Sequence, residues 1–353
     1  MKAWEMNIRK VIPYTPGEQP DQPDMIKLNT NENPYPPAPE AARMMAGLNP
    51  EELRLYPDPS ADVLVTALAE YYHLEKDQVF VGVGSDDVLA MAFMTFFNSR
   101  QPILFPDITY SFYDVWADLL RIPYKCQPLN EHFEIEKKDY EQPNGGIVIP
   151  NPNAPTGILQ ELSEIEDIIR RNADVIVIID EAYIDFGGVS ALSLIDKYEN
   201  LLVVQTYSKS RSMAGIRIGY AMGNKTLIKY LNDVKYSFNS YTMNRPSLEI
   251  GAEVLKNEAY FREVTGKIIA TRERVKAQMK ELGFHFADSQ ANFLFVTHEK
   301  YWARDLFQAL KLKHIYVRYF NRPRIDNYLR ITIGTDEEMD ALIGFFREYM
   351  KEN

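Results

Sequence analysis

The feature that most restricts the fold is an alternation of short apolar runs with helix-like stretches, which begins at residue 79 and continues to residue 222. The runs fall at residues 79–83, 102–105, 146–149, 175–179, 201–204 and 216–222. Runs of branched residues without polar alternation, as at 175–179, are typical of strands covered on both faces. The pattern therefore predicts an α/β domain in which helices wrap a largely parallel sheet. Ligands of such sheets bind at the carboxyl ends of strands, so residues that follow these runs are candidate site residues.

The composition changes on both sides of this region. Residues 1–40 are rich in proline and asparagine, which favour extended backbone, and we expect an ordered arm that joins a smaller domain. A disordered tail is the alternative. Residues 41–245 are expected to form the large domain. Residues 246–353 are expected to form the smaller one, with a helical stretch at about 249–282, short strands at 292–296 and 329–333, and a last helix at 337–349.

Charge and cysteine content exclude several classes of function. A net charge of −11 disfavours a nucleic-acid partner, because neutralising phosphates requires a basic face. The single cysteine cannot form an intramolecular disulfide, and the five histidines are scattered without metal-ligand spacing. The chain shows neither a signal peptide nor an apolar run of membrane-spanning length. We therefore expect a metal-free cytoplasmic protein without membrane or nucleic-acid partners.

Lys209 stands at the end of the run 201–204, after Thr206 and Ser208. A lysine after a strand is usually a solvated surface group. A partly desolvated lysine in a cleft can instead become a free amine that attacks an aldehyde. The two hydroxyls and Arg217, placed on the next expected strand, would together suit a phosphate group. Spacing alone favours this phosphate clamp over a solvated arginine.

Two further groups of polar residues follow or precede apolar segments. Asp180 and Tyr183 come directly after the run 175–179, where a carboxylate either caps a turn or faces a ligand. Ser85 and Asp86 open an apolar helical stretch after Gly84, so their backbone N–H groups could bind a phosphate if the carboxylates turn away; an ordinary N-cap is equally compatible. The chain has neither the dinucleotide-binding glycine fingerprint nor a P-loop.

The order of these motifs resembles that of the fold type I pyridoxal 5′-phosphate (PLP) dependent aminotransferases. The supporting motifs are Gly-Ser-Asp-Asp at 84–87, Asn-Pro-Asn-Ala-Pro-Thr-Gly at 151–157, Asp-Glu-Ala-Tyr at 180–183, Tyr-Ser-Lys at 207–209 and Gly-Ile-Arg-Ile-Gly at 215–219. The resemblance implies a mainly parallel seven-stranded sheet between helices, plus a smaller α+β domain. It also implies that Lys209 holds PLP as a Schiff base, that Asp180 pairs with the ring nitrogen, and that Tyr183 bonds the ring hydroxyl.

The same resemblance supplies the remaining contacts to the cofactor. Tyr110 is expected to stack on the ring. The residues expected around the cofactor phosphate are Ser85, Asp86, Thr206, Ser208, Arg217 and Tyr56, the last contributed by the other subunit of a homodimer. One departure concerns the turn at 151–157, where Ala154 replaces the asparagine usual in the family. Either Asn153 substitutes for this asparagine or Tyr183 alone bonds the ring hydroxyl. The loss of one hydrogen bond to the ring oxygen would raise the pKa of the lysine–cofactor imine, an effect of about 1 kcal/mol.

The substrate site is expected near residues 311–330, where six basic residues and one acidic residue give a local charge of +5. On a chain of net charge −11, this concentration favours recognition of an anion, although a solvated basic loop explains part of it. By resemblance, Arg318 and Arg330 bind the phosphate of a phosphorylated amino alcohol, and Arg330 also binds the carboxylate of a 2-oxo acid. The other expected substrate contacts are Tyr14, Tyr35 and Asn33.

Other activities remain open at this stage. An aromatic-amino-acid aminotransferase or a phosphothreonine-type decarboxylase would use the same cofactor site. A DNA-binding regulator built on this fold would need a helix-turn-helix segment, for which residues 1–24 leave no room. A nicotinamide dehydrogenase is disfavoured by the missing glycine fingerprint.

Overall fold

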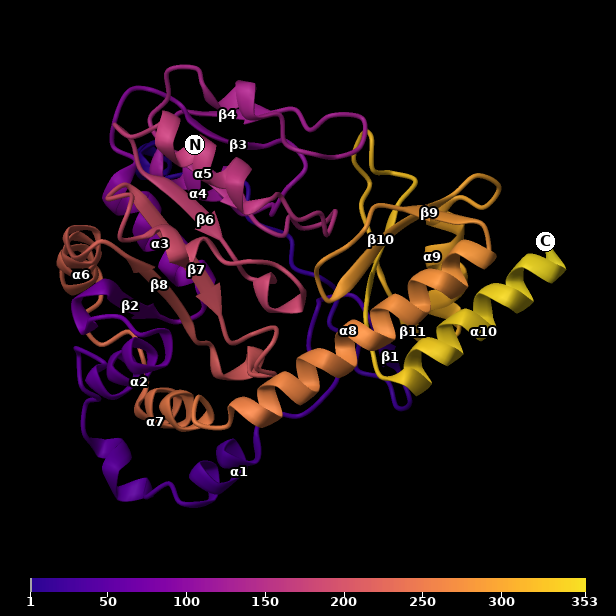
Figure 1. The fold of residues 1–353 in the computed structure, drawn as a ribbon, viewed down its shortest axis with the longest axis horizontal. Coiled ribbons are helices and arrows are strands. Elements are labelled where there is room, and N and C mark those ends of the chain that lie inside the picture. Colours follow the sequence, from indigo (N-terminus) through magenta and orange to yellow (C-terminus); the bar gives the residue numbers. More distant parts are fainter. Residues whose placement is uncertain (1) are drawn as a thin grey trace.

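The computed structural model describes residues 2–353 and contains a large and a small domain (Figure 1). A seven-stranded sheet with the order β2-β8-β7-β6-β5-β3-β4 forms the centre of the large domain. All its neighbouring strands run parallel except for β8, which is antiparallel to β2 and β7. The strands are β2 (Val79–Gly82), β3 (Ile103–Pro106), β4 (Tyr124–Gln127), β5 (Ile147–Pro150), β6 (Val177–Asp180), β7 (Leu201–Thr206) and β8 (Gly219–Gly223). The expected fold class is confirmed.

Two layers of helices bury the faces of this sheet because neighbouring residues of a strand point to opposite sides. Ile147, Ile179 and Val203 pack with α2 (Asp62–Tyr72), α5 (Leu162–Arg171) and α7 (Arg245–Val254). Val148 and Ile178 pack on the other face with α3 (Ser85–Phe96), α4 (Tyr113–Leu120) and α6 (Lys225–Phe238). Continuous apolar runs in the sequence thus correspond to strands with two buried faces.

The small domain is built on a four-stranded antiparallel sheet with the order β12-β13-β10-β9. Its strands are β9 (Phe284–Phe286), β10 (Phe293–His298), β12 (Arg318–Tyr319) and β13 (Leu329–Thr332). Its helices are α8 (Glu258–Glu281), α9 (Ala303–Leu312) and α10 (Asp336–Glu352), and α8 runs from the large domain into the small one in Figure 1. The two strands expected from the sequence, at 292–296 and 329–333, correspond to β10 and β13.

The N-terminal arm contributes β1 (Ile26–Lys27), which pairs in parallel with β11 (Ile315–Tyr316). After β1 the arm crosses to α1 (Pro39–Ala46), which packs against α7 of the large domain. Short 3₁₀ turns complete the structure at Ala3–Asn7, Pro50–Arg54, Lys76–Gln78, Lys137–Tyr140, Ile184–Phe186, Ala191–Leu194 and Ala214–Ile216.

The helical stretch expected at 249–282 is two helices, α7 and α8. Asn257 separates them, and its side chain accepts a hydrogen bond from the backbone of Tyr260 as the N-cap of α8. Leu248, Ile250 and Val254 of α7 belong to the core of the large domain. The change from one hydrophobic core to the other therefore falls between α7 and α8, later than the expected boundary at residue 246. No helix within residues 2–353 is long and apolar enough to cross a membrane.

Candidate active site

A cavity of about 120 Å³ lies at the carboxyl ends of β5, β6 and β7 and the first turn of α3. It brings together residues that are far apart in the sequence. The residues that line it are Ser85, Asp86, Tyr110, Pro150, Pro152, Ala154, Asp180, Ala182, Tyr183, Thr206, Ser208, Lys209 and Arg217. The structure brings nine of the residues expected to contact a cofactor together in this cavity, at the strand ends where ligands of such sheets bind.

Lys209 projects into this cavity from the turn after β7. Its Nζ donates a hydrogen bond to the backbone carbonyl of Thr30, at 3.0 Å, and lies 5.7 Å from the centre of the Tyr183 ring. The contact partner belongs to the arm, so the arm forms one wall beside the lysine. A neutral carbonyl holds the amine without fixing it in an ion pair, which leaves it available to react with an aldehyde.

Asp180, the last residue of β6, is buried beneath the cavity. Burial raises the pKa of its carboxyl to about 6, although hydrogen bonds from the Tyr113 hydroxyl, at 2.7 Å, and the Ala182 backbone, at 3.2 Å, oppose that shift. No lysine or arginine within residues 2–353 forms an ion pair with it. A buried carboxylate without a cationic partner is suited to pair with a protonated ring nitrogen of a ligand. Tyr113 was not expected at the site.

Arg217 lies across the N-terminus of α3 because Gly84 has no side chain. A Cβ on Gly84 would stand 2.3 Å from the Arg217 guanidinium, and Gly84 has φ of +84°, which glycine adopts without strain. Arg217 also donates to the Ser208 hydroxyl at 3.3 Å. A guanidinium, a hydroxyl and the first N–H groups of a helix therefore meet at one end of the cavity, which is an arrangement suited to a phosphate.

The alternation around residue 217 predicted a strand for Arg217, and this prediction was wrong. Its backbone is left-handed, with φ of 59°, and β8 begins two residues later at Gly219. Gly219 packs directly on the backbone of Gly84 and Ser85, where a Cβ would come within 2.2 Å. The close approach of these two segments, rather than strand alternation, directs the guanidinium toward the helix N-terminus.

The two carboxylates at the start of α3 behave differently. Asp87 turns back and accepts a hydrogen bond from the Val83 backbone at 2.9 Å, as expected of a capping residue. Asp86 faces the cavity, where it accepts from the Tyr110 hydroxyl at 2.7 Å and lies 3.5 Å from Arg217. The side chain of Asp86 thus neutralises part of the arginine charge, and the expectation that both carboxylates turn away holds for one of them.

The hydroxyls of Thr206 and Ser208 bond to each other at 3.1 Å beside Lys209. Tyr183 accepts a hydrogen bond from the Asn31 side chain at 2.9 Å. Asn153 does not line the cavity: its amide bonds the Ile108 carbonyl, Thr109 and Thr156. Ala154 lines the cavity instead, so of the two alternatives the arrangement favours Tyr183 acting alone.

A second, wider cavity of about 750 Å³ adjoins the loop that leads to α4 and contains Tyr14 and Arg318. Arg318 and Arg330 are cross-strand partners in β12 and β13. Burial and the adjacent Arg318 lower the pKa of Arg330, and its Nε has no hydrogen-bond partner within residues 2–353. The other contact of Arg330 is the backbone carbonyl of Asn29, at 3.0 Å. Two adjacent guanidiniums without a carboxylate form a site for an anion from outside the chain.

The remaining expected residues lie elsewhere. Tyr14 stacks on Phe112 with ring centres 4.2 Å apart, whereas Tyr35 packs on the small domain beside Lys267 and does not line the cavity of Tyr14. The amide of Asn33 bonds the Ser210 carbonyl and the Tyr35 backbone. Tyr56 is 79% exposed and absent from the lining of the cofactor cavity of its own chain.

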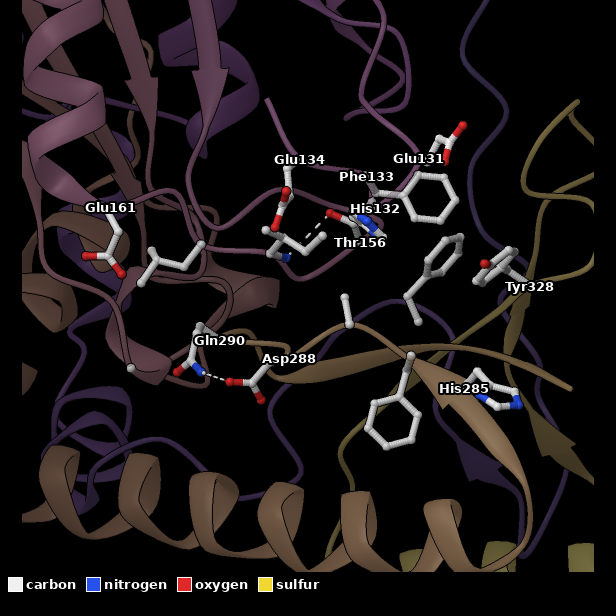
Figure 2. A pocket seen from close by; sticks show the side chains of 16 residues that line it. Glu131, His132, Phe133, Glu134, Thr156, Glu161, His285, Asp288, Gln290 and Tyr328 are labelled. Atoms are coloured by element: carbon white, nitrogen blue, oxygen red, sulfur yellow. Dashed lines mark hydrogen bonds between the residues drawn. The ribbon is translucent and has the colours of Figure 1, made fainter. Parts of the chain in front are cut away.

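The chain also has a cleft of about 810 Å³ between the domains, in which side chains of residues 131–134 face those of residues 285–290 (Figure 2). Its charged side chains include Glu131, Glu134 and Asp288, and all three residues are exposed. None of the residues expected at the active site lines it. The chemistry therefore belongs to the two smaller cavities described above.

Comparison with known proteins identifies the class of this arrangement. The family described as "Aminotransferase class I and II" matches residues 23–346, and the chain belongs to that family. Histidinol-phosphate aminotransferase from Lactococcus lactis subsp. cremoris (strain MG1363) is 52% identical over 349 residues, which cover 99% of this chain and 98% of that protein. The enzyme of the same name from Clostridium botulinum (strain Okra / Type B1) is 50% identical over 342 residues, with 97% of each chain covered. Within the family, the chain belongs to the histidinol-phosphate aminotransferases.

Solved structures agree with the fold. Histidinol-phosphate aminotransferase from Sinorhizobium meliloti in complex with pyridoxal-5′-phosphate superposes with a TM-score of 0.84 at 20% identity, covering 92% of this chain and 91% of that one. The histidinol-phosphate aminotransferase from Clostridium acetobutylicum has a TM-score of 0.85 at 22% identity and covers 93% of this chain and all of that one. At these identities, the structures establish the fold class.

Proposed function

We propose that this protein transfers an amino group from histidinol phosphate to 2-oxoglutarate, giving imidazole acetol phosphate and L-glutamate in histidine biosynthesis. The observation that carries the proposal is the 52% identity over nearly the whole chain with a histidinol-phosphate aminotransferase. The geometry supports it, because a cavity suited to PLP lies close to Arg318 and Arg330, two arginines that no carboxylate within residues 2–353 neutralises.

The residues present fit PLP. The Arg217 guanidinium, which the missing side chain of Gly84 admits to the N-terminus of α3, and the first N–H groups of that helix suit its phosphate, and buried Asp180 suits its protonated ring nitrogen. When bound, PLP supplies an aldehyde that reacts with amines and a ring that withdraws electrons from the α-carbon of the substrate. Lys209 would hold the aldehyde, and Tyr110, Tyr183, Thr206 and Ser208 would complete the contacts.

Lys209 then has two tasks. Its Nζ would hold the cofactor aldehyde and, as a free amine, would move the α-proton of the substrate as a general base. Asp180 keeps the proton on the ring nitrogen throughout. Arg330 binds the carboxylate of glutamate or 2-oxoglutarate and, together with Arg318, the phosphate of the donor, so both substrates use one site in turn. Such an enzyme follows ping-pong kinetics.

We further infer a homodimer in which Tyr56 contributes to the cofactor phosphate site of the partner subunit. In support, the single chain exposes the large apolar side chains of Leu53, Tyr56, Phe238 and Tyr241, and the rings of Tyr56 and Tyr241 stack with centres 4.6 Å apart. Exposed apolar groups of this size favour association. The cytoplasmic location expected from the sequence stays a prediction.

The dimer is tested by complementation. A Tyr56→Ala chain and a Lys209→Ala chain are each defective alone. Mixed after mild dissociation, they form hybrids in which one site has an intact Lys209 and receives an intact Tyr56 from the neighbour. Recovered activity is expected, and a mixture no more active than Tyr56→Ala alone would contradict the exchange of Tyr56.

One assay tests the function itself. With 2-oxoglutarate as acceptor, histidinol phosphate should give the largest kcat/KM when compared with phenylalanine and phosphothreonine. Preference for phenylalanine would indicate an aromatic-amino-acid aminotransferase, and release of carbon dioxide from phosphothreonine would indicate a decarboxylase. Borohydride treatment of the holoenzyme should attach the cofactor to Lys209, and attachment to another lysine would overturn the assigned role.

A further inference from the structure

Tyr183 contributes a hydroxyl to the cofactor cavity. Four other residues that line the cavity, Pro150, Pro152, Ala154 and Ala182, have side chains that cannot donate a hydrogen bond. Ala154 therefore cannot supply the donor that the family's asparagine would, and the Tyr183 hydroxyl is the candidate donor to the ring oxygen. Whether the Tyr183 hydroxyl can donate a hydrogen bond to a ligand depends on the direction in which its only proton points.

That direction is set by the arm. The Asn31 side-chain nitrogen donates to the Tyr183 oxygen at 2.9 Å, so the tyrosine hydroxyl accepts there and its proton remains for another acceptor. The orientation of the Asn31 amide is fixed in turn by Thr332 of β13. The Thr332 hydroxyl donates to the Asn31 amide oxygen at 3.0 Å and accepts the Asn31 backbone N–H at 3.0 Å.

Asn31 and Thr332 are buried, with 1% and 2% of their surfaces exposed, so water does not compete for these bonds. Asn31 also adopts a left-handed backbone with φ of 58°, a conformation that asparagine tolerates better than most residues. Hydrogen bonds in such a chain polarise one another, so a donor to the tyrosine oxygen makes its proton a better donor.

We propose that Asn31 is a positioning residue that directs the Tyr183 proton into the cavity, toward the ring oxygen of PLP, and that Thr332 holds Asn31 in that orientation. The inference rests on the proposed function for the presence of the cofactor. Because Thr332 belongs to the small domain, the chain of hydrogen bonds from Thr332 through Asn31 to Tyr183 would connect the small domain to the cofactor. Through this chain the small domain would influence the charge on the ring oxygen of the cofactor. The same chain of hydrogen bonds also explains how the site operates with alanine at position 154.

The predicted quantity is the pH midpoint at which the absorbance of the lysine-bound cofactor changes. A donor to the ring oxygen stabilises its anionic form and so lowers this midpoint. The charged and titratable groups that interact with Tyr183 or line the same cavity are Lys209, Asp86, Asp180, Tyr110, Tyr113, Arg217 and Arg330. The substitutions below leave all of them in place.

The test is a spectrophotometric pH titration of the holoenzyme. Asn31→Gly keeps the left-handed backbone without strain and should raise the midpoint by about half a unit, as expected for part of one hydrogen bond. Tyr183→Phe should raise it by about one unit. In the Tyr183→Phe background, Asn31→Gly should add no shift, because the residue acts through the tyrosine. Thr332→Val should cause a smaller rise of the same sign.

The matched control is Asn33→Gly, two residues along the same segment, whose amide bonds Ser210 and not Tyr183. Its midpoint should stay at the value of the unsubstituted holoenzyme. An unchanged midpoint in Asn31→Gly, an equal shift in Asn33→Gly, or an undiminished shift in the Tyr183→Phe background would each overturn the inference. Borohydride labelling of Lys209 in every variant separates this outcome from a failure of the proposed function.

Discussion

The cofactor cavity and the substrate site differ in whether their charged side chains have partners within the chain. In the cofactor cavity, Arg217 lies 3.5 Å from Asp86, and Asp180 accepts a hydrogen bond from Tyr113. At the substrate site, Arg318 lines the second cavity and Arg330 is its cross-strand partner, and neither forms an ion pair within residues 2–353. The first site is organised before its ligand arrives, whereas the second needs an anion to complete it.

This difference fits the length of time that each ligand stays. A resident cofactor favours a site whose polar groups already have partners. Transient substrates are better served by unneutralised arginines, because the binding energy of an incoming phosphate or carboxylate is then not spent on displacing an internal carboxylate. The following substitutions test this contrast, beginning with the largest expected effect.

Arg330→Ala should reduce kcat/KM for 2-oxoglutarate and for histidinol phosphate by about 10²- to 10³-fold, since a buried charged hydrogen bond is lost for both substrates. Steady-state kinetics with each substrate varied in turn provide the measurement. Lys313→Ala, an exposed change in the same basic segment, serves as control and should have little effect. Equal losses in the two variants would mean that the net charge of the segment, rather than the position of Arg330, binds the anions.

Asp180→Asn should stabilise the apoenzyme at alkaline pH. Burial raises the pKa of Asp180 from 3.8 to about 6, so the folded state binds its proton more tightly than the unfolded state does. The ionised carboxylate therefore destabilises the apo fold above pH 6, by about 3 kcal/mol at most, and this cost disappears below about pH 4. Thermal unfolding at several pH values should give the variant a higher Tm at pH 8 and an equal Tm at pH 4.

The same titration in the holoenzyme sharpens the comparison. With PLP bound, the ring nitrogen provides the missing partner, so the advantage of Asp180→Asn should vanish or reverse at pH 8. An advantage that persisted in the holoenzyme would show that Asp180 does not pair with the cofactor.

Arg318→Ala should weaken the binding of histidinol phosphate by about 10- to 100-fold. The binding of 2-oxoglutarate should change much less, because Arg318 is assigned to the phosphate alone. The KM and kcat/KM of each substrate provide the readout. Similar losses for both would contradict a phosphate-specific role and would make the two arginines one common anion site.

Ala154→Asn should give the smallest effect. An added amide donor in the cavity should lower the absorbance midpoint of the bound cofactor by about half a unit, in the direction opposite to Asn31→Gly. A rise, or no change, would indicate that position 154 does not face the ring oxygen.

The sequence predicted the central strands well because both of their faces are buried, which produces continuous apolar runs. It did not predict β4, whose residues Tyr124, Lys125 and Cys126 are partly or fully exposed and leave no apolar run. It also merged α7 with α8, because the residues between them are compatible with a helix and the break depends on the cap at Asn257. The positions of edge strands and of helix ends depend on local contacts, and the pattern of apolar residues does not reveal these contacts.

For the candidate site, the sequence singled out residues that lie in recognisable motifs. It often did not predict how their side chains are oriented. Lys209, Asp180 and Arg217 follow strands or turns with a clear signal, but the backbone of Arg217 is set by its packing on Gly84. Tyr113 and Asn31 were missed because their roles arise from contacts with Asp180 and Tyr183, far away in the sequence. Asn31 did have a local signal, since it stands within the same polar stretch as Asn33.

The contacts of the arm have a consequence for synthesis of the protein on the ribosome. Asn29 and Asn31 meet Arg330 and Thr332, partners separated by 301 positions, and Thr30 meets Lys209 across 179 positions. A nascent chain can complete the seven-stranded sheet once β8 has emerged, yet it has neither arginine of the anion site. The arginines that select the substrate therefore join the reactive lysine only after β12 and β13 have been synthesised and β13 has reached the arm, which left the ribosome before either domain.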